Sequence, residues 1–335
     1  MKTGVLLVNL GTPEQPTLRA VRRYLRIFLA DKRVVDVPLV LRYILLYLFI
    51  LPFRPKSSLA AYQKIWMKEG SPLLVYSQRM QQRLATALGS AYQVSLAMRY
   101  ETPSIEQALV DMQDCTRIIV MPLFPQYASA TTGSIVEKCY ALLQKRAYIP
   151  AIHVLPEFYA DPGFVAAYAG RVRTALVDTV VDRVIYSFHG LPVRHIAQSG
   201  CQVRCAGATP CPAITTKNRS CYRAQCYASA RAIAEDLGLS AADYHVAFQS
   251  RLGKTPWIEP YTDELLERLA LDSSVRDIAI VCPSFVADCL ETLEEIGMAL
   301  EERWRQLGGH SCILVPCLND DPVWVEYLAD RVRAA

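Results

Sequence analysis

Two stretches of the chain resemble each other, and this internal repeat indicates the fold. Residues 92–106 read YQVSLAMRYETPSIE, and residues 244–259 read YHVAFQSRLGKTPWIE. Two further pairs match in the same order along the chain. Residues 118–124 (IIVMPLF) match 278–285 (IAIVCPSF), and residues 5–13 (VLLVNLGTP) match 184–192 (VIYSFHGLP) more loosely. We therefore expect two similar units that face each other across a cleft, where ligands bind beyond the carboxyl ends of the strands.

Short apolar runs alternate with helix-like stretches throughout the chain. The runs are apolar on both faces, as buried parallel strands are. Asp161-Pro162 and Asp321-Pro322 each precede a periodic stretch, as an N-cap followed by proline at the first helical position does. The alternation predicts a parallel α/β architecture. The predicted strands are Val5–Leu10, Val94–Ala97, Ile118–Met121, Val184–Phe188, Val246–Phe248 and Ile278–Cys282.

The composition excludes several classes of protein. The chain has 335 residues, of which 52% are apolar, so it can bury the cores of about two domains and is not disordered. A net charge of +4 is too small to indicate nucleic acid as the main partner. No G-x-G-x-x-G or Walker A motif is present, so a nucleotide is not the expected ligand. Without a secretory signal, the eleven cysteines indicate a reducing, cytoplasmic protein and not a disulfide scaffold.

One segment, residues 37–53, is strongly apolar. Its longest uninterrupted apolar run, Tyr43–Leu51, has nine residues and the segment also contains Arg42, whereas a membrane-spanning helix needs about 20 apolar residues. Two alternatives remain: a buried helix, or a surface helix that touches a membrane or an apolar ligand.

Several polar residues follow predicted strands. His189 comes directly after the strand Val184–Phe188, which suits a general base or a metal ligand, although a backbone-bonded structural histidine is the alternative. Asp288, Glu291 and Glu295 fall on one face if the stretch after residue 283 is a helix. They are either acids that favour the helix dipole or a row of cation ligands and proton acceptors.

Two arginines occupy matching places in the repeat. Arg99 and Arg251 could each bind a ligand carboxylate through a bidentate pair, and Tyr100 and Trp257 could line an apolar pocket beside them. Ordinary surface arginines and core aromatic residues are the alternative.

Five of the eleven cysteines fall within 26 residues. They are Cys201, Cys205, Cys211, Cys221 and Cys226. C-x2-C pairs, which zinc ribbons use, are absent, whereas four thiolates from one segment can hold an iron–sulfur cluster. Cys226 begins a helix-like stretch and is the spare ligand. A reduced, metal-free thiol segment remains the alternative.

Taken together, these motifs resemble the ferrochelatase family. The resemblance rests on Val8–Pro13, Gly70–Leu73, Met98–Tyr100, Pro122–Tyr127 with Thr131–Gly133, Ser187–Pro192, Gln249–Arg251 with Pro256 and Trp257, and Phe285–Glu291. It implies two pseudo-symmetric Rossmann-like domains with parallel sheets. Residues 1–150 would form the first, with segment 37–53 as an apolar lip. Residues 151–320 would form the second, with a cysteine-rich insertion at 199–226, and residues 321–335 a C-terminal helix.

The resemblance also implies an activity, the insertion of Fe²⁺ into protoporphyrin IX to form protohaem, the last step of haem biosynthesis. His189, Glu291 and Glu295 would be the catalytic residues, with His189 and Glu291 contacting the substrate iron. The porphyrin would be bound by Tyr62, Ser71, Arg99, Tyr100 and Trp257. A coproporphyrin or other-metal chelatase, or a non-enzymatic haem or iron–sulfur sensor, are the alternatives.

Family precedent further implies a [2Fe–2S] cluster and peripheral membrane contact. Cys201, Cys205, Cys211 and Cys221 would hold the cluster, with Cys226 as the spare. The chain departs from some family members at Cys289, where they carry histidine.

Overall fold

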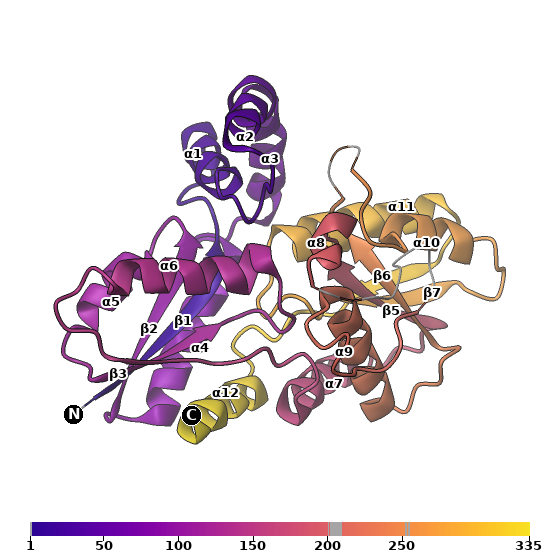
Figure 1. Cartoon of the computed structure of the whole chain (residues 1–335). Coiled ribbons are helices and arrows are strands. Elements are labelled where there is room, and N and C mark those ends of the chain that lie inside the picture. Colours follow the sequence, from indigo (N-terminus) through magenta and orange to yellow (C-terminus); the bar gives the residue numbers. More distant parts are fainter. Residues whose placement is uncertain (1, 200, 202–209, 252, 254) are drawn as a thin grey trace. The chain divides into compact units, whose positions relative to one another are not determined.

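The structure is a computed structural model that describes residues 2–199, 201, 210–251, 253 and 255–335. The chain divides into two compact units (Figure 1). The first comprises Met1–Phe124, Ala128–Glu157 and Asn319–Ala335, and the second comprises Pro125–Tyr127 and Phe158–Leu318. Each unit contains a four-stranded parallel sheet with the same strand topology. The predicted α/β class with two similar units is therefore confirmed.

The sheet of the first unit has the strand order β2-β1-β3-β4. Its strands are β1 (Thr3–Gly11), β2 (Tyr92–Tyr100), β3 (Arg117–Pro122) and β4 (Ala151–Val154). One face packs against α5 (Ile105–Asp111) and α6 (Ser134–Leu143), which follows the π-helical turn η2 (Ser129–Gly133). The other face carries α4 (Pro72–Leu88). Because β1 is central and covered on both sides, its residues Val5–Val8 are fully buried.

The first unit is completed by a segment from far along the sequence. Helix α12 (Pro322–Ala334) starts at Asp321, whose carboxylate accepts hydrogen bonds from the main chain of Val323 and Trp324, as the sequence predicts. The helix packs on α4, where the indole Nε1 of the fully buried Trp324 lies 3.3 Å from Met80 Sδ.

Helices α1 (Leu18–Leu29), α2 (Leu39–Ile44) and α3 (Leu51–Ile65), with the π-helical turn η1 (Leu45–Ile50), form a lobe beside the first sheet (Figure 1). The buried-helix alternative for residues 37–53 is wrong, because Leu48, Phe49 and Phe53 are 63%, 60% and 72% exposed. Only a few of its apolar side chains, such as Leu46 and Leu51, pack inward against α1. Within the described residues, none of the helices has the length and apolar character needed to cross a bilayer.

The sheet of the second unit has the order β6-β5-β7-β8. Its strands are β5 (Arg183–His189), β6 (Tyr244–Gln249), β7 (Asp277–Val281) and β8 (Ser311–Leu314). Helices α7 (Pro162–Ala175) and α9 (Tyr222–Asp236) pack together, and α9 contacts β6. The opposite core lies against α10 (Thr262–Leu269), the π-helical η3 (Glu291–Leu300) and α11 (Glu301–Gln306). The short α8 (Val193–Ala197) follows β5.

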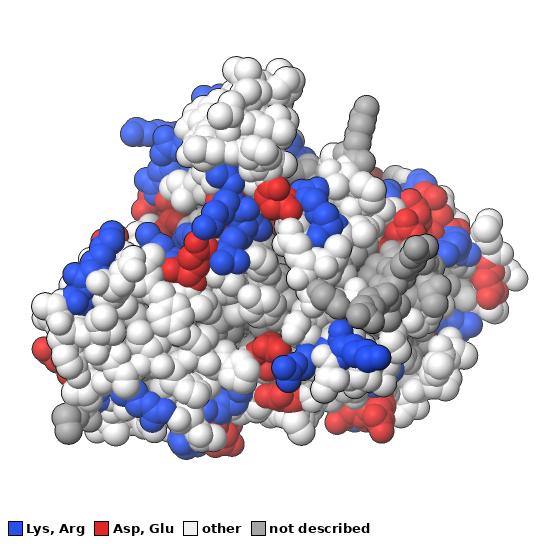
Figure 2. Space-filling model, in the orientation of Figure 1, with Lys and Arg blue, Asp and Glu red and all other residues white. Residues whose placement is uncertain are grey.

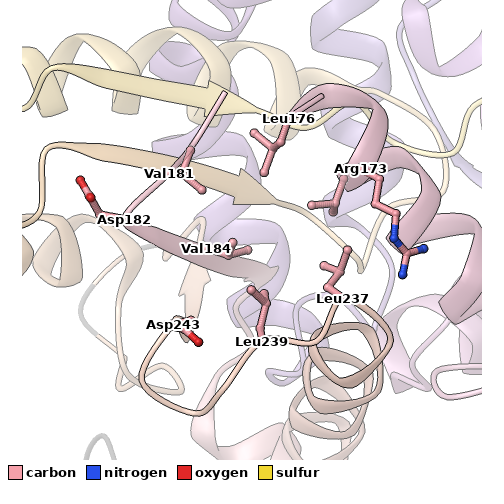
Figure 3. A pocket seen from close by; sticks show the side chains of 9 residues that line it. Arg173, Leu176, Val181, Asp182, Val184, Leu237, Leu239 and Asp243 are labelled. Carbon is pink, nitrogen blue, oxygen red and sulfur yellow. The ribbon is translucent and has the colours of Figure 1, made fainter. Parts of the chain in front are cut away.

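The amino ends of β5 and β6 border a hollow of about 440 Å³ (Figure 3). Leu176, Val184 and Leu239 supply much of its apolar lining, and Asp182 and Asp243 lie at its side. This hollow is at the opposite edge of the sheet from His189, which ends β5. In parallel sheets the carboxyl edge is where ligands bind, so the hollow is not a candidate for the chemistry of His189.

Glycines end both central strands because another backbone passes close by. A Cβ on Gly11, whose φ is +120°, would lie 2.0 Å from the carbonyl oxygen of Tyr100. A Cβ on Gly190, directly after β5, would lie 2.8 Å from the carbonyl oxygen of Gln249 and 3.3 Å from Trp257 Cε3. Only glycine allows this spacing without a shift of the chain.

Replacing Gly190 by alanine should therefore destabilise the protein by about 1–3 kcal/mol through overpacking. Gly170→Ala is the matched control, because apart from the backbone of α7 itself no atom of the described residues lies within 4 Å of the Cβ that it would add. That substitution should stabilise the helix by about 0.5–1 kcal/mol. Urea unfolding of the two variants beside the wild type measures both effects. An equal shift for both variants would contradict the close approach at Gly190.

Candidate functional site

The candidate site of the second unit is built around the main chain at the end of β5. The N–H of His189 donates to Ser284 Oγ at 3.0 Å, and its carbonyl accepts from the hydroxyl of Tyr222 at 2.8 Å. The next N–H, that of Gly190, donates to the carbonyl of Gln249 at 2.8 Å. Hydrogen bonds therefore fix the backbone on both sides of the half-buried His189 side chain.

The imidazole of His189 is held in one tautomer when neutral. Its Nδ1 lies 2.7 Å from the carbonyl oxygen of Gly190, which can only accept a hydrogen bond. Nδ1 must therefore carry the hydrogen, and Nε2 carries the lone pair. A neutral imidazole in this state can accept a proton or bind a metal ion through Nε2.

Two carboxylates of η3 belong to the same electrostatic environment. Burial raises the pKa of Glu295, while hydrogen bonds from Ser250 and the charge of His189 lower it and the charge of Glu291 raises it again, with a net rise. Ser250 donates from its N–H to one Glu295 oxygen at 2.8 Å and from its hydroxyl to the other at 2.5 Å. Glu295 is therefore positioned rigidly and is able to hold a proton nearer neutral pH than an exposed glutamate.

Asp288 does not share the surface of these two glutamates. Helix η3 begins only at Glu291, so the even helical face expected from residue 288 onward is wrong. Asp288 precedes it and is buried, where it accepts from the hydroxyl of Thr292 at 3.0 Å and from the N–H of Cys317 at 3.3 Å. Those contacts give Asp288 a structural role at the start of η3.

Trp257 lies beside the end of β5. It pairs with Pro192 through an isolated β-bridge, and its ring edge faces the position that a Cβ on Gly190 would take. The turn after β5 and the segment after β6 are thus fastened to each other. His189 and Trp257 therefore lie in one continuous part of the second unit.

In the first unit, Asp31 gathers the polar side chains at the end of β2. Its Oδ2 accepts from Arg99 Nη2 at 2.7 Å, from the Tyr100 hydroxyl at 2.8 Å and from Ser134 Oγ at 2.6 Å. Burial raises the pKa of Asp31, but these bonds and the N–H of Arg33 outweigh it, so the net shift is downward. Arg99 and Tyr100 are thus brought together, with the charge of Arg99 matched by Asp31.

Ser71 and Tyr62 lie elsewhere in the first unit. Ser71 is buried at the start of α4 and its oxygen accepts from the Thr12 hydroxyl at 2.7 Å. Tyr62 is buried in α3, with its ring edge-on to Trp66 at 6.1 Å.

The expected match between Arg99 and Arg251 is wrong. The N–H of Met98 donates to the carbonyl of Pro103, and the N–H of Phe248 donates to that of Pro260. The two bonds show that Met98 and Phe248 hold equivalent positions in the two units. The residues that follow them, Arg99 and Gln249, are therefore equivalent too. Arg251 lies beyond the end of β6, is exposed, and forms ion pairs with Asp263 and Glu264 at 2.7 and 2.8 Å. The sequence repeat aligns Pro103 with Pro256, whereas the structural equivalent of Pro103 is Pro260. This misalignment is why the sequence paired Arg99 with Arg251.

The cysteine-rich segment leads into α9. Cys221 is the N-cap residue of α9, which begins at Tyr222, so Cys226 lies inside the helix and does not begin it. Cys201 is half-buried, and Cys211, Cys221 and Cys226 are buried. Cys205 lies outside the described residues. Among the residues that are described, no three His, Cys, Asp or Glu side chains are grouped so as to hold a metal ion.

One neighbour of Cys211 favours a thiolate. The buried guanidinium of Arg223 donates to Cys211 Sγ at 3.0 Å. Burial, Cys221 and Cys201 raise the pKa of the Cys211 thiol and Arg223 opposes that rise, with a net shift upward. A buried cation beside sulfur stabilises the negative charge that a thiolate ligand carries. The contact with Arg223 is therefore the feature of this segment that suits thiolate ligation.

Sequence reasoning missed the residues that hold the candidate ones in place. Asp31 and Ser134 lie 68 and 35 residues from Arg99, and no local pattern connects them. Ser250 directly follows β6 in a left-handed conformation, with φ of 65°, and only its adjacency to Gln249 could have drawn attention to it. Tyr222 is 33 residues from His189 in the sequence. Its position directly after Cys221, in the cysteine-rich segment, could have drawn attention to it.

Comparisons with known proteins identify the family of the chain. The family model for ferrochelatase matches residues 2–335. Ferrochelatase from Legionella pneumophila (strain Lens) is 49% identical over 333 residues, covering 99% of each chain. Ferrochelatase from Coxiella burnetii (strain Dugway 5J108-111) is 47% identical over 335 residues, covering 99% of this chain and 93% of the relative.

Solved structures share the fold at low sequence identity. The chelatase SirB from Bacillus subtilis with Fe³⁺ has a TM-score of 0.55 at 14% identity, covering 99% of this chain and 95% of SirB. CbiX, described as the terminal enzyme for the biosynthesis of sirohaem in denitrifying bacteria, has a TM-score of 0.51 at 11% identity, covering 100% and 99%. The fold is thus that of the chelatases, and the chain belongs to the ferrochelatase family of porphyrin metal chelatases.

Proposed function

We propose that this protein is a lyase that inserts Fe²⁺ into protoporphyrin IX to form protohaem, the last step of haem biosynthesis. The observation that carries the proposal is the half-buried His189 at the carboxyl end of the central strand β5, with its Nδ1 committed to Gly190 and Glu295 within its electrostatic reach. The family assignment supplies porphyrin and ferrous iron as the substrates.

The reaction needs two pyrrole N–H protons to leave the porphyrin while Fe²⁺ exchanges its water ligands for nitrogens. We propose that Nε2 of His189 accepts a proton or contacts the iron, and that Glu291 shares the contact with Fe²⁺. Glu295, whose pKa is raised by burial, takes up and passes on protons. Ser250 keeps both Glu295 oxygens fixed during this transfer.

We propose that Tyr62, Ser71, Arg99, Tyr100 and Trp257 contact the porphyrin. Asp31 already balances the charge of Arg99. We therefore assign Arg99 mainly to the shape of the binding surface and less to the charge-based binding of a propionate. The exposed apolar side chains of the α1–α3 lobe favour protoporphyrin over the more highly carboxylated coproporphyrin. Comparison of the rates with the two porphyrins distinguishes these substrates.

His189→Ala should reduce the rate of metal insertion at least ~100-fold, because a positioned base typically contributes 10²–10⁴-fold. Porphyrin binding, followed by fluorescence quenching, should change little. His310→Ala is the matched control in the same unit, since the His310 side chain is 74% exposed and pairs with the partly exposed Asp277. If His189→Ala keeps more than about a tenth of the wild-type rate, the assignment of His189 as the base is wrong.

We also propose that the α1–α3 lobe lies on the inner face of the cytoplasmic membrane. Figure 2 shows the upper part of this lobe largely without charged side chains, with basic residues beside and below it. Leu39, Val40 and Phe49 are among the exposed apolar residues, and Arg26 and Arg54 among the exposed basic ones. The cysteines that the structure describes are all free thiols, which is typical of a reducing compartment.

Sedimentation with lipid vesicles tests this docking. Binding should be stronger to vesicles with anionic lipid than to neutral vesicles, and should weaken as salt rises. Leu48→Glu should reduce binding several-fold, because a charge would have to enter the apolar boundary. Leu271→Glu, at an 87% exposed leucine of the second unit, should not. Equal loss for both variants, or protein that resists alkaline carbonate extraction, would contradict reversible docking through the lobe.

For the cysteine-rich segment we propose a [2Fe–2S] cluster held by Cys201, Cys205, Cys211 and Cys221. Such a cluster supplies one-electron chemistry and a cross-link of its own segment when bound. Arg223 supports the proposal through its bond to Cys211 Sγ. Because Cys226 is fully buried inside α9 and burial raises the pKa of its thiol well above the usual value, it is a poor candidate for the fourth ligand.

Anaerobically purified protein should be red-brown with visible absorption bands. Serine in place of Cys201, Cys205, Cys211 or Cys221 should remove the colour, whereas Cys226→Ser should keep it. Cys312→Ser, in β8 and far along the sequence from the segment, serves as the control and should keep the colour too. Colourless, zinc-containing protein would contradict the cluster, while loss of colour on changing Cys226 would contradict only the choice of ligands.

A further inference from the structure

The main chain of His189 is held by two side chains. The His189 N–H donates to Ser284 Oγ at 3.0 Å, and the Tyr222 hydroxyl donates to the His189 carbonyl at 2.8 Å. Both side chains are buried, so water does not compete for either bond.

The single hydrogen of the Tyr222 hydroxyl is committed to this bond. The His189 carbonyl oxygen can only accept, so the phenolic hydrogen points to it across the 2.8 Å between the two oxygens. Tyr222 is buried, and burial raises the pKa of its hydroxyl, so the oxygen keeps the hydrogen that the bond needs. In such a dry environment the hydrogen bond is stronger than it would be in water.

The consequence for the imidazole follows from the geometry of one peptide unit. The His189 carbonyl and the Gly190 N–H belong to the same planar peptide, and Tyr222 and Gln249 bind its two sides. The carbonyl of the next residue, Gly190, is the acceptor for His189 Nδ1. If the first peptide rotates, the Gly190 carbonyl moves and Nδ1 loses its partner.

We propose that Tyr222 is a positioning residue for His189: by fixing the 189–190 peptide it keeps Nδ1 protonated and leaves the lone pair on Nε2. The proposal rests on the catalytic role proposed above for His189. Tyr222 itself contacts neither substrate, because its hydroxyl is buried and bonded within the unit.

The test is Tyr222→Phe in the full-length protein, which removes one oxygen and keeps the ring. We expect kcat for metal insertion to fall about tenfold, since misplacement of a reacting group by a fraction of an ångström costs one to two orders of magnitude. The KM for porphyrin should stay within about twofold, because the substrate contacts are not changed. Tyr186→Phe is the matched control: Tyr186 is equally buried in β5, and its hydroxyl has no hydrogen-bond partner in the described part of the chain.

A second measurement reads the tautomer directly and does not depend on activity. The chain has five histidines, so ¹⁵N-histidine NMR of the protein as purified, without added iron or porphyrin, has only five imidazoles to resolve. His189→Ala identifies the signals of His189. In the wild type they should show a protonated Nδ1 and an unprotonated Nε2, and in Tyr222→Phe a mixture of tautomers, whereas Tyr186→Phe should resemble the wild type.

Three outcomes overturn the proposal: an unchanged kcat in Tyr222→Phe, an unchanged tautomer, or an equal effect in Tyr186→Phe. If Tyr222→Phe does not fold, Ser284→Ala removes the other side-chain bond to the His189 main chain and should shift the tautomer in the same direction. A shifted tautomer together with full activity of His189→Ala would leave the positioning role intact and refute the catalytic role of His189. The experiments can therefore refute the positioning role of Tyr222 and the catalytic role of His189 independently of each other.

Discussion

Parallel pairing on both edges of one central strand is the constraint on which the rest of the structure depends. In each unit the first strand, β1 or β5, lies between two strands that come later in the sequence. Helices cover both faces, so the strand is buried and mostly apolar, and its side chains become accessible only where it ends. His189 is at that point in β5. The close spacing at Gly11 and Gly190 has the same origin, because the neighbouring strand ends at the same edge.

The two units apply this plan to different chemistry. At the end of β2, a buried carboxylate, Asp31, collects donors from Arg99, Tyr100 and Ser134, and the result is a closed, charge-balanced cluster. In the second unit the carboxylates of η3 meet hydroxyl and imidazole groups instead, and burial shifts the pKa of Glu295 upward. A network with all its bonds satisfied favours a rigid surface, whereas groups with shifted pKa values favour proton transfer. The cluster of the first unit therefore suits a rigid binding surface, and the groups of the second unit suit proton transfer.

The sequence allowed the fold class and the buried strands to be predicted, because runs such as Val184–Phe188 are apolar on both faces. The edge strands β4 and β8 were not predicted, since each has only four residues, all of them half-buried or exposed. His189 could be singled out because a local rule, the end of a strand, marks it. Ser250, Asp31 and Tyr222 could not, because their importance comes from contacts formed only after folding. The even helical face drawn through Asp288 failed because η3 starts three residues later and is π-helical.

The return of residues 319–335 to the first unit affects how the protein is made. The ribosome finishes the strands of the first unit early, yet α12, which covers α4 through Trp324, is made only after the roughly 160 residues of the second unit. At 5–20 residues per second this interval is about 10–30 seconds. During that time the surface of α4 around Met80 lacks its cover in the nascent chain. The unit that begins the chain is thus the one that folds to completion later.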